Sequence, residues 1–538
     1  MIWGDGFKFY KQYHLVLYQY RAVLNQIHSH FLPFMNIAQQ TPAATDTHVK
    51  VLVIGSGFGG LAAGIRLKQT GQHSFLILER EQDVGGVWRD NDYPGCACDV
   101  QSNLYSFSFA PNPDWSRHFS PQGEIHAYLR RCAREFGLAP HLRFKHEVTR
   151  MDWREEQGLW EVQTTQGVFH AQAVIGGFGS LSDPAIPSLK GLETFEGKVF
   201  HSATWPKDFN PEQQRVAVVG TGASAIQFIP AIQPHVKQMH VFQRTAPWVM
   251  PRHDGPVSAS ISRLYARLPW LQKLARLRTY VQRESFVLGF RHPAIMRIKQ
   301  KTGLKHLHSA VQDAQLRAKL TPDYTLGCKR ILISNHYYPA MAKPNVEVIA
   351  SGIREVRAHG VVGSDGQMRE VDAIIFGTGF QTKDLPFAHL VFNGRGESLA
   401  QHWAGNPRAY MGTTVHGFPN LFLLHGPNIG LGHTSVILMF EAQVEHILNV
   451  LRLMRQRHHD VIEPTPQAQQ RFAAEMEQRI AGTVWTAGGC ESWYLDATGK
   501  ASSLWPTFTF SYMRRAHRVR SADYQGRRAQ RQSAGAAA

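Results

Sequence analysis

The sequence predicts an α/β protein with two Rossmann-like dinucleotide-binding domains, because one local pattern occurs in it twice. The first copy begins with a short apolar run at 51–54, which is typical of a buried parallel strand. A glycine-rich turn, a helical stretch and a second apolar run at 75–78 follow. The second copy has the same order, from the strand at 216–219 to the strand at 240–242. Two strand–turn–helix–strand units in 538 residues predict two dinucleotide sites.

The first turn has the form G-x-G-x-x-G, and each glycine has a distinct task. Gly55 makes the tight turn, Gly57 lets a pyrophosphate approach the backbone at a positive helix end, and Gly60 permits close helix–strand packing. Glu79 ends the second strand and is placed to accept a hydrogen bond from a ribose hydroxyl. An acid there repels a 2′-phosphate, so FAD fits better than NADP. The alternative, a purely structural glycine loop, explains the complete unit less well.

The second turn consists of Gly220, Thr221, Gly222, Ala223 and Ser224, and Ala225 stands where the third glycine would be. Gln243 and Arg244 follow the next strand, and Arg244 takes the position that Glu79 has in the first unit. A cation at that position favours the 2′-phosphate of NADPH. The alternative is a surface arginine at a strand end.

The domain organisation follows from two strands that each run into glycines. One ends at 176 and is followed by Pro184 and Pro187, and the other ends near 376. We interpret them as the exit from the first domain and the return to it, which makes the FAD domain discontinuous. The expected divisions are a poorly ordered N-terminal extension at 1–45, a FAD-binding domain at 46–195 and 375–510, an NADPH-binding domain inserted at 196–374 with a basic helical insertion at 257–325, and a basic tail at 511–538.

The formal net charge is +17, which is compatible with a nucleic acid, an anionic membrane or an anionic small molecule as partner. Part of this charge is a crowd of arginines after 513, and we interpret that segment as a solvated, disordered tail in preference to a nucleic-acid site. No run approaches the ~20 apolar residues of a membrane helix, so no integral membrane segment is expected. The aromatic-rich stretch 1–34 is either an upstream extension or an amphipathic surface helix.

The five cysteines are widely spaced, which makes a disulfide framework unexpected and favours a reducing, cytoplasmic location. Cys96 and Cys98 form only a C-x-C pair without a partner pair. We therefore expect neither a zinc site, or any other metal site, nor a dithiol redox centre.

Two longer motifs carry a family resemblance. Phe195, Gly197, His201 and Trp205, followed by proline, match F-x-G-x-x-x-H-x-x-x-W-[PD]. Residues 85–99, which include Val87, Trp88 and Asp99, match [AG]-G-x-W-x-x-x-x-[FY]-P-G-x-x-x-D. Over roughly 50–510 the chain resembles the type I Baeyer–Villiger monooxygenases. The related flavin-containing monooxygenases, which oxidise amines and sulfides, carry Tyr or Phe at the position of Trp205.

The resemblance implies roles for particular residues. Arg330 matches the catalytic arginine, Lys329 a residue that holds the NADPH 2′-phosphate, and Asp99 the acid that orients the arginine. A fixed guanidinium would stabilise both a C4a-peroxyflavin anion and the tetrahedral adduct with a ketone. Without the resemblance, the Lys-Arg pair reads as a solvated patch and Asp99 as a loop cap. His201 would lie on the inter-domain linker and couple cofactor binding to domain motion.

The remaining matches are to cofactor-lining positions. They are Val87, Trp88, Tyr105 and Val148 on the FAD side and Trp493 on the nicotinamide side, where a core aromatic is the alternative.

The expected reaction converts a ketone, NADPH and O2 into an ester or lactone, NADP+ and water. Two alternatives are an N- or S-oxygenating flavin monooxygenase and a non-catalytic flavin sensor. The sequence does not identify the ketone, although its C-terminal part resembles family members acting on linear or aryl ketones, and it does not predict the oligomeric state.

Overall fold

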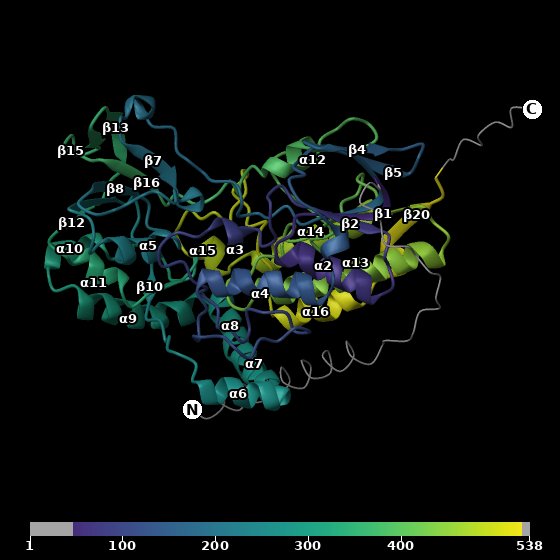
Figure 1. The fold of residues 1–538 in the computed structure, drawn as a ribbon, viewed down its shortest axis with the longest axis horizontal. Coiled ribbons are helices and arrows are strands. Elements are labelled where there is room, and N and C mark those ends of the chain that lie inside the picture. The colour runs from purple at the N-terminus through teal and green to yellow at the C-terminus, as the bar shows by residue number, and fades with distance from the viewer. Residues whose placement is uncertain (1–46, 530–538) are drawn as a thin grey trace, which may run out of the picture.

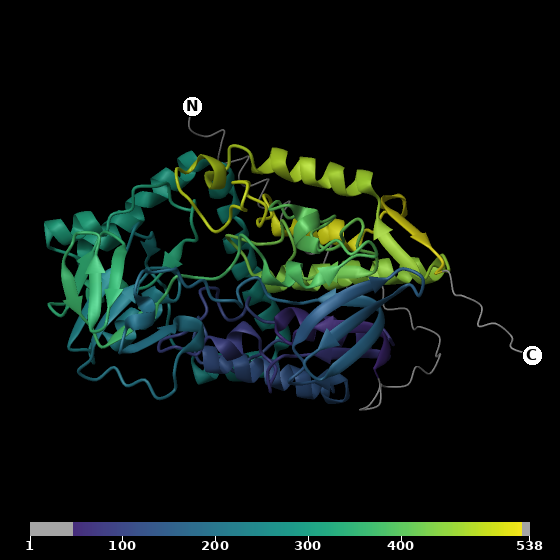
Figure 2. The ribbon, with the colours of Figure 1, turned by 90° about the horizontal axis from the view of Figure 1, so that it is seen from above.

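The computed structural model describes residues 47–529. The predicted N-terminal extension at 1–45 and the end of the predicted tail, 530–538, lie outside the described residues. The described chain forms two lobes that lie side by side along the long axis of the molecule (Figures 1 and 2). Each lobe is built around its own sheet.

The first sheet lies in the lobe on the right of Figure 1 and has the strand order β17-β4-β5-β6-β1-β2-β3, with β18 paired to β6. The pairs β3–β2, β2–β1, β1–β6 and β6–β18 are parallel, whereas β4, β5 and β6 form an antiparallel meander. The strands are β1 (His48–Ile54), β2 (Phe75–Leu78), β3 (Leu142–Arg143), β4 (Val148–Arg154), β5 (Leu159–Thr164), β6 (Gly167–Gly176), β17 (Val391–Phe392) and β18 (Leu421–Leu423).

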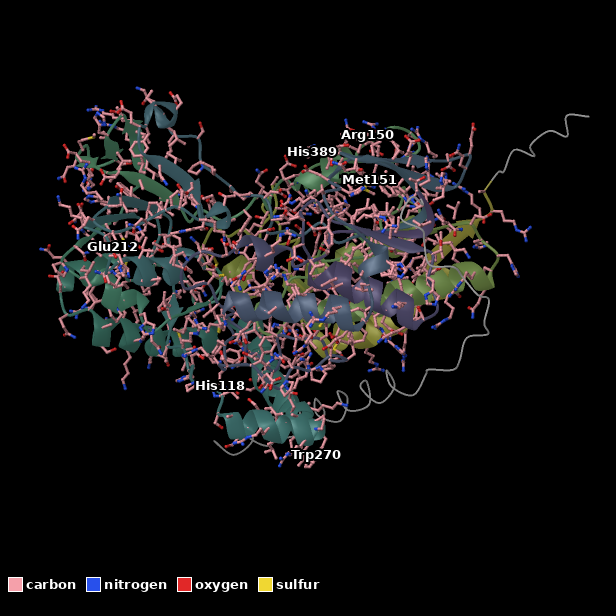
Figure 3. The ribbon with its side chains drawn as sticks, in the orientation of Figure 1. His118, Arg150, Met151, Glu212, Trp270 and His389 are labelled. Atoms are coloured by element: carbon pink, nitrogen blue, oxygen red, sulfur yellow. A yellow bond between two sulfur atoms is a disulfide. The ribbon has the colours of Figure 1, made fainter. Side chains whose placement is uncertain are left out.

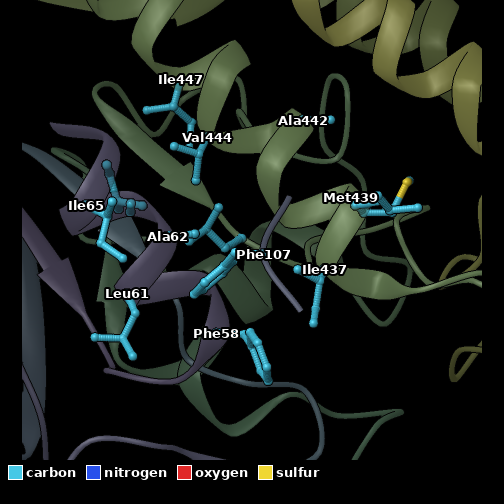
Figure 4. Packing of buried hydrophobic residues seen from close by; sticks show 14 of the residues in the cluster. Phe58, Leu61, Ala62, Ile65, Phe107, Ile437, Met439, Ala442, Val444 and Ile447 are labelled. Atoms are coloured by element: carbon cyan, nitrogen blue, oxygen red, sulfur yellow. The ribbon is translucent and has the colours of Figure 1, made fainter. Parts of the chain in front are cut away.

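The core of this lobe lies between helices α2 (Phe58–Gln69) and α13 (Val436–Gln456), which are far apart in the sequence. Figure 4 shows Leu61, Ala62 and Ile65 of α2 opposite Val444 and Ile447 of α13. These apolar side chains are fully or almost fully buried. Burial of this seam fixes α2, and therefore the glycine turn at its N-terminus, against the sheet.

The second sheet is entirely parallel and has the order β12-β9-β8-β16-β7. Its strands are β7 (Lys198–His201), β8 (Arg215–Val219), β9 (Gln238–Phe242), β12 (Val346–Ile349) and β16 (Ala373–Phe376), with helix α5 (Ala225–Ile232) after β8. All of them come between β6 and β17 of the first sheet, and β16 extends two residues past the expected boundary at 374. The predicted α/β fold with two Rossmann-type sheets is confirmed.

Helices occupy most of the stretch for which a helical insertion was expected. They are α6 (Ala259–Arg267), α7 (Pro269–Glu284), α8 (Phe286–Arg291), α9 (Pro293–Ala310) and α10 (Ala314–Lys319). The short parallel strands β10 (Val249–Met250) and β11 (Leu332–Ile333) flank them. Helix α6 lies at the outer end of this insertion, away from both sheets (Figure 1).

The remaining elements surround these parts. A three-stranded antiparallel sheet comprises β13 (Ile353–Arg357), β14 (Gly360–Gly363) and β15 (Met368–Glu370). The other helices are α3 (Val87–Asp90), α4 (Gln122–Glu135), α11 (Tyr337–Met341), α12 (Leu399–Trp403), α14 (Pro466–Ile480), α15 (Val484–Ala487) and α16 (Thr509–His517). Within residues 47–529, no helix is long and apolar enough to cross a membrane, and no cluster of His, Cys, Asp or Glu side chains could hold a metal ion.

The two chain segments that connect the lobes run antiparallel and are hydrogen-bonded to each other. The amide of Ala185 donates to the carbonyl of Gly379 (2.9 Å), and the amide of Gln381 donates to the carbonyl of Asp183 (2.9 Å). The hydroxyl of Thr378 also donates to the carbonyl of Ala185 (2.6 Å). The exit and the return are therefore paired, and the lobes are joined by a double connection.

The expectation of a disordered tail is wrong for residues 511–529. Helix α16 packs on α13, and strand β20 (Tyr524–Arg527) pairs with β19 (Val461–Pro464). Tyr512 and Tyr524 are buried, and Arg515 forms an ion pair with Glu475 (2.9 Å). Apolar residues at helical spacing among the arginines give the segment a buried face, which a count of charges does not reveal.

The expectation about the cysteines is also wrong. Cys328 and Cys490 form a disulfide across a sequence separation of 162 residues, while Cys96, Cys98 and Cys132 are free. So long a separation carries no signal in sequence spacing. The cysteine pattern therefore no longer supports a reducing compartment.

Candidate active site

A cavity of about 830 Å³ is lined by residues of both lobes. It brings together many of the predicted site residues: Gly55, Gly57, Glu79, Val87, Trp88, Asp99, Tyr105, Val148, Ala223, Ser224, Arg330 and Trp493. Other predicted residues lie outside its wall: Gly60, Gly220, Thr221, Gly222, Gln243, Arg244, Lys329 and the linker residues Phe195, Gly197, His201 and Trp205. The wall thus contains parts of both dinucleotide turns and of the Asp99–Arg330 pair.

The first glycine turn has the geometry that its sequence predicts. Gly55 has φ +84°, and a Cβ on Gly60 would overlap the carbonyl oxygen of Gly55. A Cβ on Gly57 would instead lie 3.7 Å from its nearest neighbour, so the packing of the described chain does not require glycine there. Gly57 caps α2 without a side-chain hydrogen bond from any described residue. This open helix N-terminus at the cavity fits the pyrophosphate of a dinucleotide such as FAD.

Glu79 is almost completely buried at the end of β2, and its carboxylate is held by its surroundings. It accepts hydrogen bonds from the amide (3.0 Å) and the hydroxyl (2.6 Å) of Ser56 and from the amide of Glu81 (3.0 Å). Arg89 forms an ion pair with it at 3.1 Å. The sequence did not identify Arg89, which neutralises the buried acid and fixes it beside the turn.

The second turn is less enclosed. Ser224 stands at the N-cap of α5, its side chain makes no capping hydrogen bond to the helix, and it lines the cavity. Arg244 is exposed at the end of β9. Burial lowers the pKa of Lys329; the charge of Asp323 opposes this shift, and the positive charge of Arg244 acts in the same direction as burial. Two cations thus lie close together near the second turn, which fits a 2′-phosphate. Gln243 is buried and donates to the carbonyl of Lys319 (2.7 Å).

Asp99 and Arg330 form a bidentate ion pair at the cavity wall. Both Nε (3.0 Å) and Nη2 (2.6 Å) of Arg330 donate to one carboxylate oxygen of Asp99. The side chains are 25% (Asp99) and 39% (Arg330) exposed, so the pair faces the cavity. The negative charge of Asp99 raises the pKa of Arg330 despite burial. Burial would raise the pKa of Asp99, but the nearby guanidinium groups of Arg330 and Arg283 outweigh it and hold that pKa below its usual value.

Arg283, near the C-terminus of α7, is a further cavity residue that the sequence did not identify. Its Nη2 donates to the backbone carbonyl of Asp99 (2.7 Å) and its Nε to the side chain of Gln101 (2.7 Å). The helical insertion therefore contacts the Asp99 loop directly. Nothing in the local sequence distinguishes this arginine from the other cations of the insertion, because its position depends on a contact between distant segments.

The aromatic residues at the wall include two contacting pairs. The indole of Trp88 donates to the hydroxyl of Tyr105 (3.0 Å). The rings of Trp493 and Tyr494 are tilted against each other with centroids 4.4 Å apart, and both residues line the cavity. Burial raises the pKa of Tyr494 to about 12, although the charge of Arg330 opposes the shift. Tyr494 was not singled out from the sequence and keeps its proton beside the ion pair.

The linker motif lies next to the cavity but does not form its wall. His201 is buried, accepts a hydrogen bond from the amide of Ala203 (3.1 Å) and contacts the ring of Phe380 on the returning connection. Burial lowers the pKa of His201 to about 4, so it is neutral at ordinary pH. Trp205 packs against Phe200 and its neighbours in the core of the second lobe. A Cβ on Gly197 would overlap the carbonyl of Asp372. A role of His201 in coupling the lobes stays a prediction.

Comparisons with known proteins agree with this geometry. Residues 48–271 match a family model described as flavin-binding monooxygenase-like. The chain is 50% identical over 480 residues to a Baeyer–Villiger monooxygenase of Streptomyces coelicolor, which covers 89% of this chain and 92% of the relative. It is 48% identical over 477 residues to a Baeyer–Villiger monooxygenase of Pseudomonas aeruginosa, with coverages of 88% and 90%.

Solved structures give the same result. Cyclohexanone monooxygenase from Rhodococcus sp. Phi1 bound to NADP+ superposes with a TM-score of 0.79 at 29% identity, covering 90% of this chain and 100% of that chain. An oxidised steroid monooxygenase bound to NADP gives 0.80 at 28% identity, with coverages of 89% and 100%.

Two Rossmann-type sheets whose turns share one cavity fit a flavoprotein that uses a second dinucleotide, and the matching family model is that of flavin-binding monooxygenases. The identity to the curated relatives is more specific. The chain belongs to the Baeyer–Villiger monooxygenase family.

Proposed function

We propose that this protein uses FAD, NADPH and O2 to convert a ketone into an ester or lactone. The observation that carries the proposal is the Asp99–Arg330 pair on a cavity wall shared by both dinucleotide turns. The chemistry that FAD would supply here, when bound, is the activation of O2 with electrons from NADPH. Gly57, the open N-terminus of α2 and Glu79 would hold FAD, while Ser224, Arg244 and Lys329 would hold NADPH.

The chain's own contribution to the oxygen insertion is electrostatic. Negative charge develops on the carbonyl oxygen of the ketone when that carbon is attacked. Arg330 cannot lose its proton at ordinary pH, so its guanidinium stabilises this charge in a site that is partly shielded from water. Asp99 holds the guanidinium through two hydrogen bonds to one oxygen, which restricts its orientation.

Asp99 also neutralises much of the charge that Arg330 presents, and Arg283 compensates for this. An ion pair exerts only a dipolar field on a third charge, whereas the group of Asp99, Arg330 and Arg283 has a net positive charge. Arg283 thus has two functions in the proposal. It positions the Asp99 loop through the backbone carbonyl, and it leaves the cavity wall positive toward an anion.

The decisive experiment is Arg330→Ala. Hydride transfer between the dinucleotides needs no partner for an oxyanion, so the variant should keep its FAD and still be reduced by NADPH. Ester formation should fall by ~100- to 1000-fold, the usual effect of losing one preorganised oxyanion donor. NADPH oxidation should then continue with release of H2O2. The measurement is ester and H2O2 formed per NADPH consumed, and near wild-type coupling in this variant would contradict the proposal.

A second experiment tests the charge of Arg283. Because this arginine helps to hold the pKa of Asp99 low, Arg283→Gln should raise that pKa. Ester coupling should then be lost at a higher pH than in the wild type as the pH falls, since the Asp99–Arg330 pair needs the ionised carboxylate. Cys98, Tyr105 and Tyr494 also face Asp99, but burial raises the pKa of each, so they stay neutral in this range.

Two further variants show whether the effect of Arg283→Gln comes from the lost charge or from altered packing. Arg283→Lys keeps the charge and should leave the pH midpoint close to that of the wild type. Arg278→Gln removes an exposed arginine from the same helix and should change nothing. FAD content and NADP+ affinity serve as independent readouts of folding. Equal pH profiles for Arg283→Gln and the wild type would remove Arg283 from the proposal.

A further inference from the structure

The outer end of the helical insertion carries an unusual group of exposed apolar side chains. We refer to it as the α6–α7 corner. It consists of Ile261 (39% exposed), Leu264 (43%), Leu268 (39%), Trp270 (56%) and Leu274 (52%). Helix α6 has no buried residue. Figure 3 shows Trp270 at the outer end of the insertion, away from both sheets. The corner therefore contributes nothing to the cores that stabilise the fold.

The arrangement of these side chains is ordered. Ile261, Leu264 and Leu268 occur at the spacing that places them on one face of α6 and its C-terminal cap. Trp270 and Leu274 are one turn apart near the N-terminus of α7. Single exposed apolar residues are common on proteins, but a contiguous group marks an interaction surface.

The charge around the corner has one sign. The stretch 255–283 contains no Asp or Glu and carries cations throughout. Arg263, Arg267, Lys273 and Arg278 are exposed. Among residues 47–529 they have no carboxylate partner within ion-pair distance. An apolar stripe with Trp and Leu, bordered by unpaired Lys and Arg, is the composition of helices that lie in the plane of a membrane interface.

We propose that the α6–α7 corner docks the protein on the surface of an anionic lipid bilayer. The apolar residues enter the boundary between headgroups and acyl chains, and the surrounding cations contact anionic headgroups. A nucleic acid fits less well, because it would bind the cations and leave Trp270 and Leu274 without an apolar partner. Attachment in this manner needs no spanning helix.

The same helices connect the bilayer surface to the candidate active site. Helix α7 is 16 residues long, about 24 Å, and its far end places Gln282 and Arg283 at the cavity. Phe286 and Phe290 of α8 line the cavity as well. A docked protein would thus hold this wall of the cavity close to the lipid phase, where an apolar ketone concentrates. This consequence rests on the proposed function, whereas docking itself does not.

The test is co-sedimentation of the full-length holoenzyme with lipid vesicles. Binding is expected to vesicles of phosphatidylcholine mixed with phosphatidylserine, and binding to phosphatidylcholine alone should be much weaker. Added salt should reduce binding to the mixed vesicles. The double variant Trp270→Glu, Leu274→Glu should reduce the partition coefficient by roughly tenfold or more. Lys273→Gln and Arg278→Gln should each reduce it by roughly fivefold, as expected for one cation near such a surface.

The matched control is Met368→Glu, which places one Glu on an exposed apolar position of the second lobe. It should bind vesicles like the wild type. FAD content and NADPH oxidation without ketone should be unchanged in all these variants, which separates a failure of docking from a failure of the proposed function.

Several outcomes would overturn the proposal. One is that the wild type does not bind the mixed vesicles. Another is that the corner variants bind them as strongly as the wild type. A change of oligomeric state in the corner variants without vesicle binding would identify a second copy of the chain as the occupant instead. If the Trp270→Glu, Leu274→Glu variant bound vesicles as strongly as the wild type, and both proteins also bound DNA, the corner would be a non-specific cationic patch.

Discussion

The two glycine turns have nearly the same sequence pattern but differ in how tightly the protein encloses them. At the third position of the first turn, a Cβ on Gly60 would overlap the carbonyl of Gly55, whereas the second turn has a buried Ala225 at the matching position. At the strand ends, Glu79 is buried within hydrogen bonds, and Arg244 is exposed. In the proposed function, this difference fits a first turn that retains its cofactor and a second turn whose cofactor exchanges with solvent. The comparison shows that one motif can serve both purposes through its surroundings.

The largest effect is expected for Gly60→Ala. The added methyl group cannot fit without moving the turn, and overpacking of this kind costs ~1–3 kcal/mol. We expect the purified variant to lose nearly all of its FAD, read from the flavin absorbance per protein. Gly123→Ala is the control, because nothing lies within 4 Å of its added Cβ. Full flavin content in Gly60→Ala would refute the idea that this turn is rigidly enclosed.

An intermediate effect is expected for Arg244→Ala at the open site. The loss of one charge-assisted contact to a phosphate costs ~1.5–3 kcal/mol. The KM for NADPH should therefore rise by about tenfold or more, while the kinetics with NADH stay the same. Arg354→Ala removes an exposed arginine elsewhere in the same lobe and should change neither. If the wild type used NADPH and NADH with equal kcat/KM, the assignment of the second turn would fail.

The smallest effect is expected for Ala225→Gly, which recreates the glycine of the first turn. Removing one methyl group at the start of α5 should cost no more than ~1 kcal/mol. Thermal unfolding should shift slightly, and both FAD content and the KM for NADPH should stay within about twofold of the wild type. A large loss of either would show that the second turn is as tightly packed as the first.

The sequence predicted well those parts of the molecule that depend on local patterns of neighbouring residues. The turns at 55–60 and 220–225, the strands before them and the insertion of one unit into the other follow from local patterns. The pairing of Asp99 with Arg330 was available only through the family resemblance, because these residues are distant in the chain. The structure places them in contact.

The parts that the sequence could not predict depend on contacts between remote segments. Arg89 beside Glu79 occupies a variable position of the 85–99 motif, and Arg283 beside Asp99 belongs to no motif. Only the folded arrangement distinguishes the two from surface arginines. The tail failed for a different reason. The prediction of disorder relied on the many arginines of this segment. The buried residues Tyr512 and Tyr524, which hold the segment in place, lie 12 positions apart and give no clear pattern in the sequence.

The disulfide between Cys328 and Cys490 changes the covalent topology of the molecule. The second lobe is joined to the first by the two paired connections and by this bond, since Cys490 belongs to the chain that has returned to the first lobe. A protease that cut both connections, near 183 and near 381, would therefore not release the second lobe. On a denaturing gel without reductant, the nicked protein would run as two species, the fragment before the first cut and a disulfide-linked pair of the other two fragments. Added thiol would separate that pair and give three fragments.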